Sequence, residues 1–341
     1  MTQPIELMGA PGSPYTRKML ALMRYRQIPY KIHWTTGQVP DGFPKPKVAL
    51  LPTYFLPDAA GELQAVTDST PLIRRFEKDY EGRSVIPDSP VLSFLNELIE
   101  DYADEWLTKA MFHYRWAHEV DYKNAGPLLI YWGSSVIEDE MAATMSDHFS
   151  KRQIDRLYVV GSNDTTAPII EAAYARFVTL LDRLLSVKGY VLGARPSAAD
   201  FAILGQMSQL AIVEPTSAKI TRDISARVRA WLDRMDDLSG LNPEKNDWFS
   251  GDEGTEALRP LLTEIGRTYA PVMMANVKAV MAGEATFETK VDGAPWTQPT
   301  FKYQAKSLSW IREAYFDLKP EDQSQVDAML DGTGCEALFG S

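Results

Sequence analysis

A serine in a Gly/Pro-rich turn is the first candidate for chemistry in this chain of 341 residues. Gly12-Ser13-Pro14 stands directly before a predicted basic helix, and Tyr15 and Thr16 add two more hydroxyl groups. A helix N-terminus has unpaired N–H groups and a partial positive charge, so a hydroxyl placed there can help to hold a thiolate. Ser13 is the leading candidate, Tyr15 and Thr16 are rivals, and a purely structural helix cap is the alternative.

Two further motifs follow in the same part of the chain. Leu51-Pro52 ends an apolar run directly before a predicted strand. A cis bond there would expose the main chain of Leu51 to an extended peptide ligand, although most X-Pro bonds are trans and Pro52 could simply start an edge strand. Asp68-Ser69 opens a predicted helix, where the hydroxyl and the helix amides can receive a carboxylate and the acid can take an ammonium group. The structural alternative for this pair is again a helix cap.

The elements that must position these motifs alternate in the first part of the chain. The order is strand, helix, strand, loop, strand, strand and helix, which builds a sheet with helices packed on it. The predicted strands are 5–8, 30–34, 53–56 and 63–66, and the predicted helices are 15–27 and 70–80.

Helices dominate after the linker Pro87-Asp88-Ser89-Pro90, and no later sheet is predicted. From Val91 onwards apolar residues recur at helical spacing, with acidic residues elsewhere on the helical wheel. Further helices are predicted at 167–187, 197–212, 223–238, 258–281 and 301–318. The final segment is expected to pack instead of dangling, because disordered tails are poor in aromatic residues. Its aromatic residues include Trp296, Phe301, Trp310, Tyr315 and Phe316.

These motifs, in this order, resemble the glutathione transferase family. The S-P-Y turn followed by R-K is similar to the serine-type catalytic turn of that family, and the stretch 193–200 resembles the capping sequence of a buried helix in its second domain. Ser197 and Asp200 have the spacing of a capping box. The resemblance covers about residues 1–240. It implies an α/β thioredoxin-like domain at 1–84 and an all-α helical domain at 89–240, followed by a mostly helical extension at 241–341 packed on it.

The resemblance also implies a role for each motif in binding glutathione. The hydroxyl of Ser13 would donate to the sulfur of glutathione, with Tyr15 as the alternative. The main chain of Leu51, beside a cis Pro52, would bind the cysteinyl part. Asp68 and Ser69 would receive the γ-glutamyl part, although Asp is shorter than the Glu that is more frequent in the family.

Other parts of the expected site are less specific. Lys47, with Lys45 as an alternative, is the candidate to meet the glycine carboxylate of glutathione, although most lysines in such loops are only solvated. Tyr102 and Trp106 lie on the helix that, by resemblance, faces the ligand across the domain cleft. They are the candidates for an apolar substrate pocket, although aromatic residues at helical spacing usually serve the core.

Composition excludes several other classes of function. The net charge of -11 disfavours nucleic acid and anionic membrane surfaces as partners. The start of the chain lacks a basic region followed by an apolar stretch, which suits a cytoplasmic protein. The single cysteine, Cys335, cannot close an intrachain disulfide. The four histidines show no HExxH motif and no i, i+4 pair, so no metal is expected.

The sequence thus predicts a glutathione transferase, in which an activated thiolate attacks a small apolar electrophile. Conjugation, as in detoxification, is the default reaction, while thioether cleavage, dehalogenation, isomerisation and peroxide reduction share its first step. The family implies a homodimer. The alternative is a non-catalytic protein that keeps the fold as a binding or scaffold module.

Overall fold

A four-stranded mixed sheet forms the N-terminal part of the protein. The computed structural model describes residues 3–35 and 37–340. The strand order is β2-β1-β3-β4, with β1 parallel to β2 and antiparallel to β3. The strands are β1 (Ile5–Gly9), β2 (Tyr30–Trp34), β3 (Thr53–Pro57) and β4 (Leu63–Val66), and the helices are α1 (Pro14–Tyr25) and α2 (Ser69–Asp79). This arrangement confirms the predicted thioredoxin-like domain and its order of elements.

Helix α1 begins where its sequence predicts. Ser13 caps it by accepting a hydrogen bond from the backbone N–H of Thr16, and Pro14 occupies the first helical position, where a missing N–H costs nothing. The run Met19 to Met23 is buried throughout, because α1 contacts α8 on one side and the sheet on the other, where Tyr54 of β3 reaches Met23. The start of this helix is therefore held from both sides.

The second part of the chain is helical, as predicted. Its first helix begins at Pro90 and is capped by Ser89, so the linker ends where expected. The predicted capping box of Ser197 and Asp200 is also present. The elements are α3 (Pro90–Tyr102), the π-helical turn η1 (Ala103–Leu107), α4 (Thr108–Ala117), α5 (Glu119–Tyr131), α6 (Asp139–Ile154), η2 (Leu157–Val160), α7 (Ala167–Lys188), α8 (Ala198–Leu210), α9 (Pro215–Ile224) and α10 (Ala226–Met235). The helix predicted at 223–238 corresponds to α10, which begins three residues later than predicted because Ser225 ends α9 and caps α10.

The last hundred or so residues fold onto the helical part and are not purely helical. They form α11 (Gly251–Ala282), the hairpin β5 (Thr286–Val291) and β6 (Ala294–Pro299), α12 (Lys302–Phe316), α13 (Pro320–Leu330) and η3 (Cys335–Leu338). The prediction of no later sheet was wrong. Asp292 and Gly293 both have positive φ, at 51° and 81°, which is the backbone of a tight two-residue hairpin turn. The Asp-Gly pair was the sequence signal for this hairpin.

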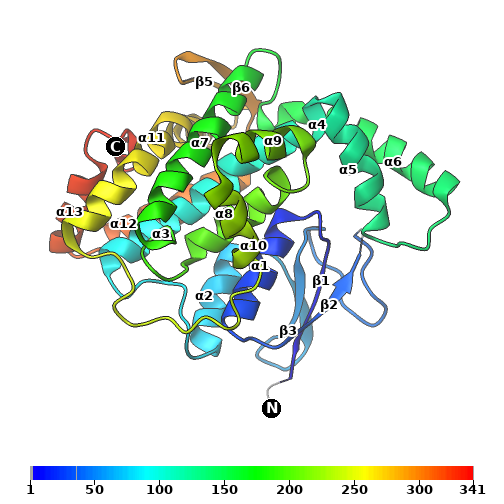
Figure 1. Cartoon of the computed structure of the whole chain (residues 1–341), viewed down its shortest axis with the longest axis horizontal. Helices are drawn as coiled ribbons and strands as arrows, with labels where there is room; N and C mark the ends of the chain where they lie inside the picture. Colours follow the sequence, from blue (N-terminus) through cyan, green and yellow to red (C-terminus); the bar gives the residue numbers. More distant parts are fainter. Residues whose placement is uncertain (1–2, 36, 341) are drawn as a thin grey trace.

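One hydrophobic core runs through all three predicted segments. It joins Leu7 on β1, Phe177 on α7 and Trp296 on β6. Figure 1 shows the sheet at the lower right, the hairpin at the top, and α11 to α13 on the left beside α3 and α7. The extension therefore packs on the helical part, as expected. Among the described residues, no helix combines the length and the apolar character needed to cross a membrane.

Candidate functional site

Ser13 lies at the N-terminus of α1 with its hydroxyl pointing toward the neighbouring loop. It is half-buried, and its backbone is extended, with φ -92° and ψ 117°. Its Oγ accepts from the N–H of Thr16 at 3.2 Å and donates to the carbonyl oxygen of Leu51 at 3.0 Å. The structure thus brings two of the predicted binding residues together, although they are 38 positions apart.

The rival hydroxyls are both committed elsewhere. Tyr15 donates to the backbone carbonyl of Asp104 at 2.8 Å, and burial raises the pKa of Tyr15 well above its usual value. Thr16 is fully buried, and its hydroxyl oxygen accepts from the N–H of Ala10 at 3.4 Å. Of these three hydroxyls, that of Ser13 is the one that contacts the Leu51-Pro52 loop.

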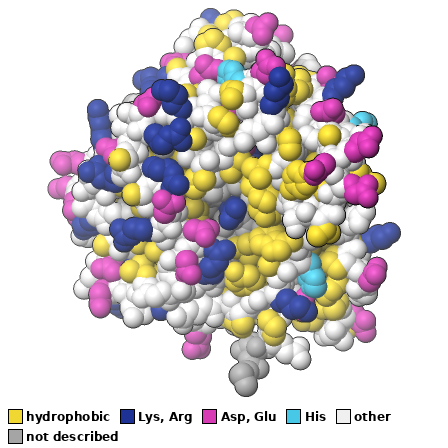
Figure 2. Space-filling view, turned by 45° about the vertical axis from the view of Figure 1, so that its right-hand side comes forward, with side chains coloured by type: hydrophobic (Ala, Val, Ile, Leu, Met, Phe, Trp, Pro, Cys, Tyr) yellow, Lys and Arg dark blue, Asp and Glu magenta, His cyan; other side chains and the backbone are white. Residues whose placement is uncertain are grey.

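The Leu51-Pro52 peptide bond is cis, which confirms the expected geometry at this position. Pro52 is buried directly before β3, and Thr53 donates from its hydroxyl to the carbonyl of Leu50 at 2.6 Å. Apolar side chains are exposed nearby, with Trp34, Val48 and Leu50 each close to half exposed or more. Figure 2 shows a face of the molecule on which hydrophobic side chains gather in a broad band.

Asp68 and Ser69 open α2, as predicted. Asp68 adopts φ 85° and ψ 108°, and its side chain makes no capping hydrogen bond. A positive φ is strained for a residue other than glycine, and such strain gathers at ligand sites. Ser69 is buried, and its Oγ accepts from Nζ of Lys18 at 3.2 Å.

Lys18 is a member of this site that the sequence did not single out. Its side chain is fully buried, and Nζ lies 2.8 Å from Oε1 of Glu100 and 2.5 Å from Oδ2 of Asp104. Burial alone would lower the pKa of Lys18, but these two carboxylates raise it overall, so the ammonium group stays charged. Lys18 therefore ties α1 to the start of α2 through Ser69 and to α3 and η1 through the two acids.

Three acidic residues of the α3–η1 segment are also buried, whereas the helical wheel placed them away from the apolar face. Glu100, Asp104 and Glu105 are all at most 6% exposed. Burial raises the pKa of Asp104 to about 6 and that of Glu105 to about 8. Two layers cover them, since α1 packs on one side and the C-terminal extension on the other. A helical wheel shows only which side of one helix is apolar, so it does not predict that a second layer of the protein will bury the polar side.

Tyr303, from the extension, is the other group that the sequence did not reveal. Its hydroxyl donates to Oδ1 of Asp68 at 2.9 Å, although the two residues are 235 positions apart. Burial raises the pKa of Asp68, and the hydrogen bond from Tyr303 partly opposes that rise. Helix α12 thus reaches the N-terminus of α2. The aromatic content of the tail indicated that it packs but not where.

The turn that carries Ser13 is fixed by the helical part of the protein. Arg115, on α4, donates to the carbonyl of Gly12 at 3.0 Å, and Gln209, on α8, donates to that of Pro11 at 3.2 Å. Helix α8 also approaches closely at Gly205, where an added Cβ would lie 2.6 Å from the carbonyl oxygen of Pro14. The position of the Ser13 hydroxyl therefore depends on packing between the two parts of the chain.

The remaining candidates are not brought to this turn. Tyr102 is fully buried against Phe177 and Tyr269, and Trp106 is buried beside Trp296, with ring centroids 5.5 Å apart. The core holds both side chains, and a role in a substrate pocket stays a prediction. Lys45 and Lys47 are exposed in the loop between β2 and β3, and their role stays a prediction as well.

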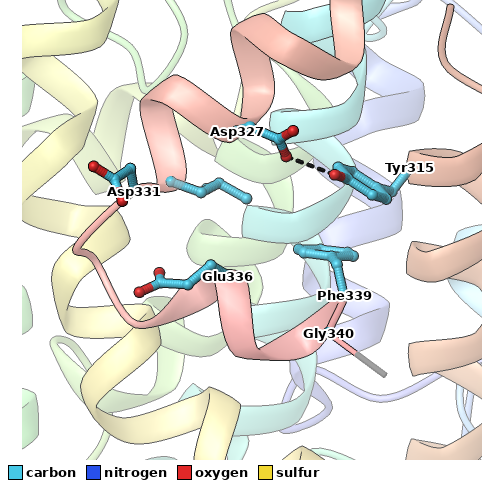
Figure 3. A pocket seen from close by; sticks show the side chains of 7 residues that line it. Tyr315, Asp327, Asp331, Glu336, Phe339 and Gly340 are labelled. Carbon is cyan, nitrogen blue, oxygen red and sulfur yellow. Dashed lines mark hydrogen bonds between the residues drawn. The ribbon is translucent and has the colours of Figure 1, made fainter. Parts of the chain in front are cut away.

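A cavity of about 350 Å³ lies far from this turn, between α12, α13 and η3. Figure 3 shows Asp327, Asp331 and Glu336 around it, with Tyr315 donating to Asp327 at 2.5 Å. Glutathione carries two carboxylates, which three acids would repel. This cavity is therefore a poor candidate for the same ligand.

Comparison with known proteins places the first part of the chain. Residues 7–84 match the family described as glutathione S-transferase, N-terminal domain. No curated protein matches the chain significantly.

Several solved structures align with most of the chain. A glutathione S-transferase from Methylobacterium radiotolerans, in complex with glutathione sulfonate, is 17% identical, with 71% of this chain and 99% of that chain covered and a TM-score of 0.36. A GST-like protein from Pseudomonas syringae is 16% identical, covering 74% and 81%, with a TM-score of 0.39. A Tau class enzyme from mango is 14% identical, covering 74% and 96%, with a TM-score of 0.41. These TM-scores are too low to support a role for any residue. The resemblance to glutathione S-transferases therefore depends on the family match of residues 7–84 and on the four-stranded sheet of the N-terminal part.

Proposed function

Since residues 7–84 form a glutathione S-transferase N-terminal domain, we propose that this protein binds glutathione there and uses Ser13 to hold its sulfur as a thiolate. The observation that carries the proposal is the convergence of three separate motifs. Ser13 contacts the carbonyl of Leu51 beside the cis Pro52, and Lys18 links the helix capped by Ser13 to Ser69. In this proposal, glutathione extends from the cis-proline loop to the start of α2.

Each group has a definite part in this proposal. The N–H and C=O of Leu51 pair with the cysteinyl main chain, which sets the sulfur beside Ser13. The γ-glutamyl carboxylate accepts from the hydroxyl of Ser69 and from the first amides of α2, where the helix dipole is positive. The carboxylate of Asp68 accepts from the γ-glutamyl ammonium. Tyr303 holds Asp68 in place and favours its ionised form.

Activation of the sulfur follows from its position. A free thiol has a pKa near 8.5, and a site at a helix N-terminus lowers it to roughly 3.5 to 7.5. The hydroxyl of Ser13 would exchange its present acceptor, the carbonyl of Leu51, for the thiolate. The bound thiolate then gains from proximity as well as from its lowered pKa.

The reaction proposed is conjugation. The thiolate forms a bond with an electrophilic carbon of a small apolar substrate, and either a leaving group departs with the bonding electrons or a proton is taken up. We also propose, from the family, a cytoplasmic homodimer that acts in detoxification. Light scattering of the purified protein tests the dimer.

A non-catalytic binding module is the second candidate. One observation favours it: Ser13 and Asp68 are both hydrogen-bonded within the protein, to Leu51 and Tyr303. A site closed in this way could serve a scaffold. Replacing Ser13 by alanine separates the two candidates. An enzyme of this mechanism should lose most of its turnover, whereas a scaffold has no turnover to lose and should keep its role.

The experiment that tests the proposal is calorimetric titration of glutathione into the purified protein. We expect binding in the micromolar to millimolar range that falls sharply in Asp68→Asn and in Ser69→Ala. Asp88→Asn is the matched control, because Asp88 is exposed in the linker before α3. A turnover screen with apolar electrophiles follows. Failure of the folded wild type to bind glutathione would remove the enzyme proposal.

A further inference from the structure

Two histidines and a glutamate converge on the side of α4 away from the Ser13 turn. His113 lies on α4, His118 stands between α4 and α5, and Glu171 lies on α7. One ligand atom from each residue lies within 4.8 Å of the other two. Nε2 of His113 is 3.2 Å from Oε1 of Glu171, and Nε2 of His118 is 3.1 Å from the same oxygen.

These separations fit ligands of one small cation. A tetrahedral metal with bonds of about 2.0 to 2.1 Å holds its ligand atoms about 3.3 Å apart. Both His–Glu distances are close to that value. Nε2 of His118 is also shielded from solvent and has no hydrogen-bond partner, although the carboxylate oxygen is near. A nitrogen lone pair directed at a cation accounts for that arrangement better than an ion pair does.

One neighbour of the cluster holds a histidine ring in place. Ser162 lies 2.8 Å from Nδ1 of His113, so a hydrogen bond there fixes the ring and directs Nε2 toward Oε1 of Glu171, 3.2 Å away. Metal-bound histidines usually have such a partner on the second ring nitrogen. His113 is buried, whereas the side chains of His118 and Glu171 are 35% and 39% exposed, which gives an ion a path of entry.

We propose that His113, His118 and Glu171 bind one divalent transition-metal ion of the zinc class, with water completing its coordination. Two imidazoles and one carboxylate suit such ions, whereas Mg²⁺ and Ca²⁺ prefer oxygen ligands. The ion joins α4, the corner before α5, and α7. The proposal is independent of glutathione binding, since none of its ligands touches the Ser13 turn.

The spacing of the histidines explains why the sequence did not reveal this site. Five positions along a continuous helix would turn the two side chains about 140° apart. Here α4 ends at Ala117, and His118 is extended, with φ -105° and ψ 138°. The break returns the second ring to the side of the first.

The test is titration of Zn²⁺ into chelator-treated full-length protein without a polyhistidine tag. We expect one ion per chain, a higher melting temperature with Zn²⁺, and the visible spectrum of tetrahedral Co²⁺ on substitution. His118→Ala and Glu171→Gln should each weaken binding at least a hundredfold, and both residues are exposed enough for the variants to fold. Ser162→Ala should weaken it roughly tenfold.

His148→Ala is the matched control, since that histidine is exposed on α6 and should leave binding unchanged. Absence of stoichiometric Zn²⁺ uptake by the wild type would overturn the proposal. Equal uptake by the wild type, His118→Ala and Glu171→Gln would overturn it too, because it would place the ion elsewhere. Glutathione titration of the same variants distinguishes the two sites, because the affinity for glutathione should not change.

Discussion

Replacing Ser13 by alanine removes one hydroxyl that has two roles. In the fold it caps α1 through the N–H of Thr16 and donates to Leu51. Loss of a helix cap costs about 1 kcal/mol and loss of a neutral hydrogen bond about 1 kcal/mol more. Against a total stability on the order of 5 to 15 kcal/mol, the Ser13→Ala protein should still fold.

The substitution should reduce catalysis more, in proportion, than it reduces stability. A hydrogen bond to a charged group contributes about 1.5 to 3 kcal/mol, which corresponds to about one to two units in the pKa of the bound thiol. In the Ser13→Ala protein, we therefore expect the pKa of the bound glutathione thiol to rise by about one to two. The value of kcat/KM near neutral pH should fall about tenfold to a hundredfold or more. Glutathione affinity should change less, since its other contacts remain.

The assay combines the ultraviolet absorbance of the bound thiolate against pH with the pH dependence of kcat/KM. Ser225→Ala is a matched control. Ser225 also caps a helix, accepting from the N–H of Val228 at 3.0 Å, and also donates one hydrogen bond, to Asp182 at 2.6 Å. The Ser225→Ala protein should lose at least as much stability, because this bond goes to a carboxylate, with no change in the thiol pKa. An unchanged thiol pKa in Ser13→Ala, in a folded protein that binds glutathione, would refute the reasoning.

Three further predictions concern residues that surround the Ser13 turn and the start of α2. Tyr303→Phe removes a hydrogen bond that lowers the pKa of Asp68, so glutathione should bind roughly tenfold more weakly, most of all at acidic pH, as calorimetry at several pH values will show. Burial raises the pKa of Glu105 to about 8, above its value in the unfolded chain near 4.3, so the folded state keeps a proton that the unfolded state loses. Stability should therefore fall as pH rises between those values, and Glu105→Gln should make this slope shallower in urea unfolding without removing it, because burial also raises the pKa of Asp101 to about 7. Gly205→Ala puts a Cβ against the carbonyl of Pro14, which should cost about 1 to 3 kcal/mol in unfolding experiments and weaken glutathione binding.

Each of these has a counterpart at an exposed position. Tyr158→Phe, Glu62→Gln and Gly240→Ala make the same chemical changes where the side chain, or the space around the glycine, is open. Unchanged affinity in Tyr303→Phe would show that Asp68 needs no help from the extension. A slope in Glu105→Gln as steep as in the wild type would assign the pH dependence to other groups. Wild-type stability and binding in Gly205→Ala would show that α1 tolerates displacement.

The sequence by itself determined the local structure around the candidate site. Pro14 and Ser13 specify a helix start and Leu51-Pro52 a strand entry, because caps and prolines act on their immediate neighbours. Asp68-Ser69 marks a second helix start, although Asp68 makes no capping hydrogen bond there. The strands and α2 also follow from short-range periodicity. The boundaries of α1, β2 and β4 lie within two residues of the prediction.

Tertiary structure alone decided which groups complete the site. In the sequence, Lys18 is one of several cations in a basic helix. In the structure, its burial between Glu100, Asp104 and Ser69 makes it the link from α1 to α3, η1 and α2. Tyr303 meets Asp68 only because α12 folds back across the helical part. Contacts between residues far apart in sequence depend on how whole faces of helices pack together, and no local sequence pattern specifies that packing. The three proposed metal ligands meet for the same reason, since a helix end and a second helix bring them together.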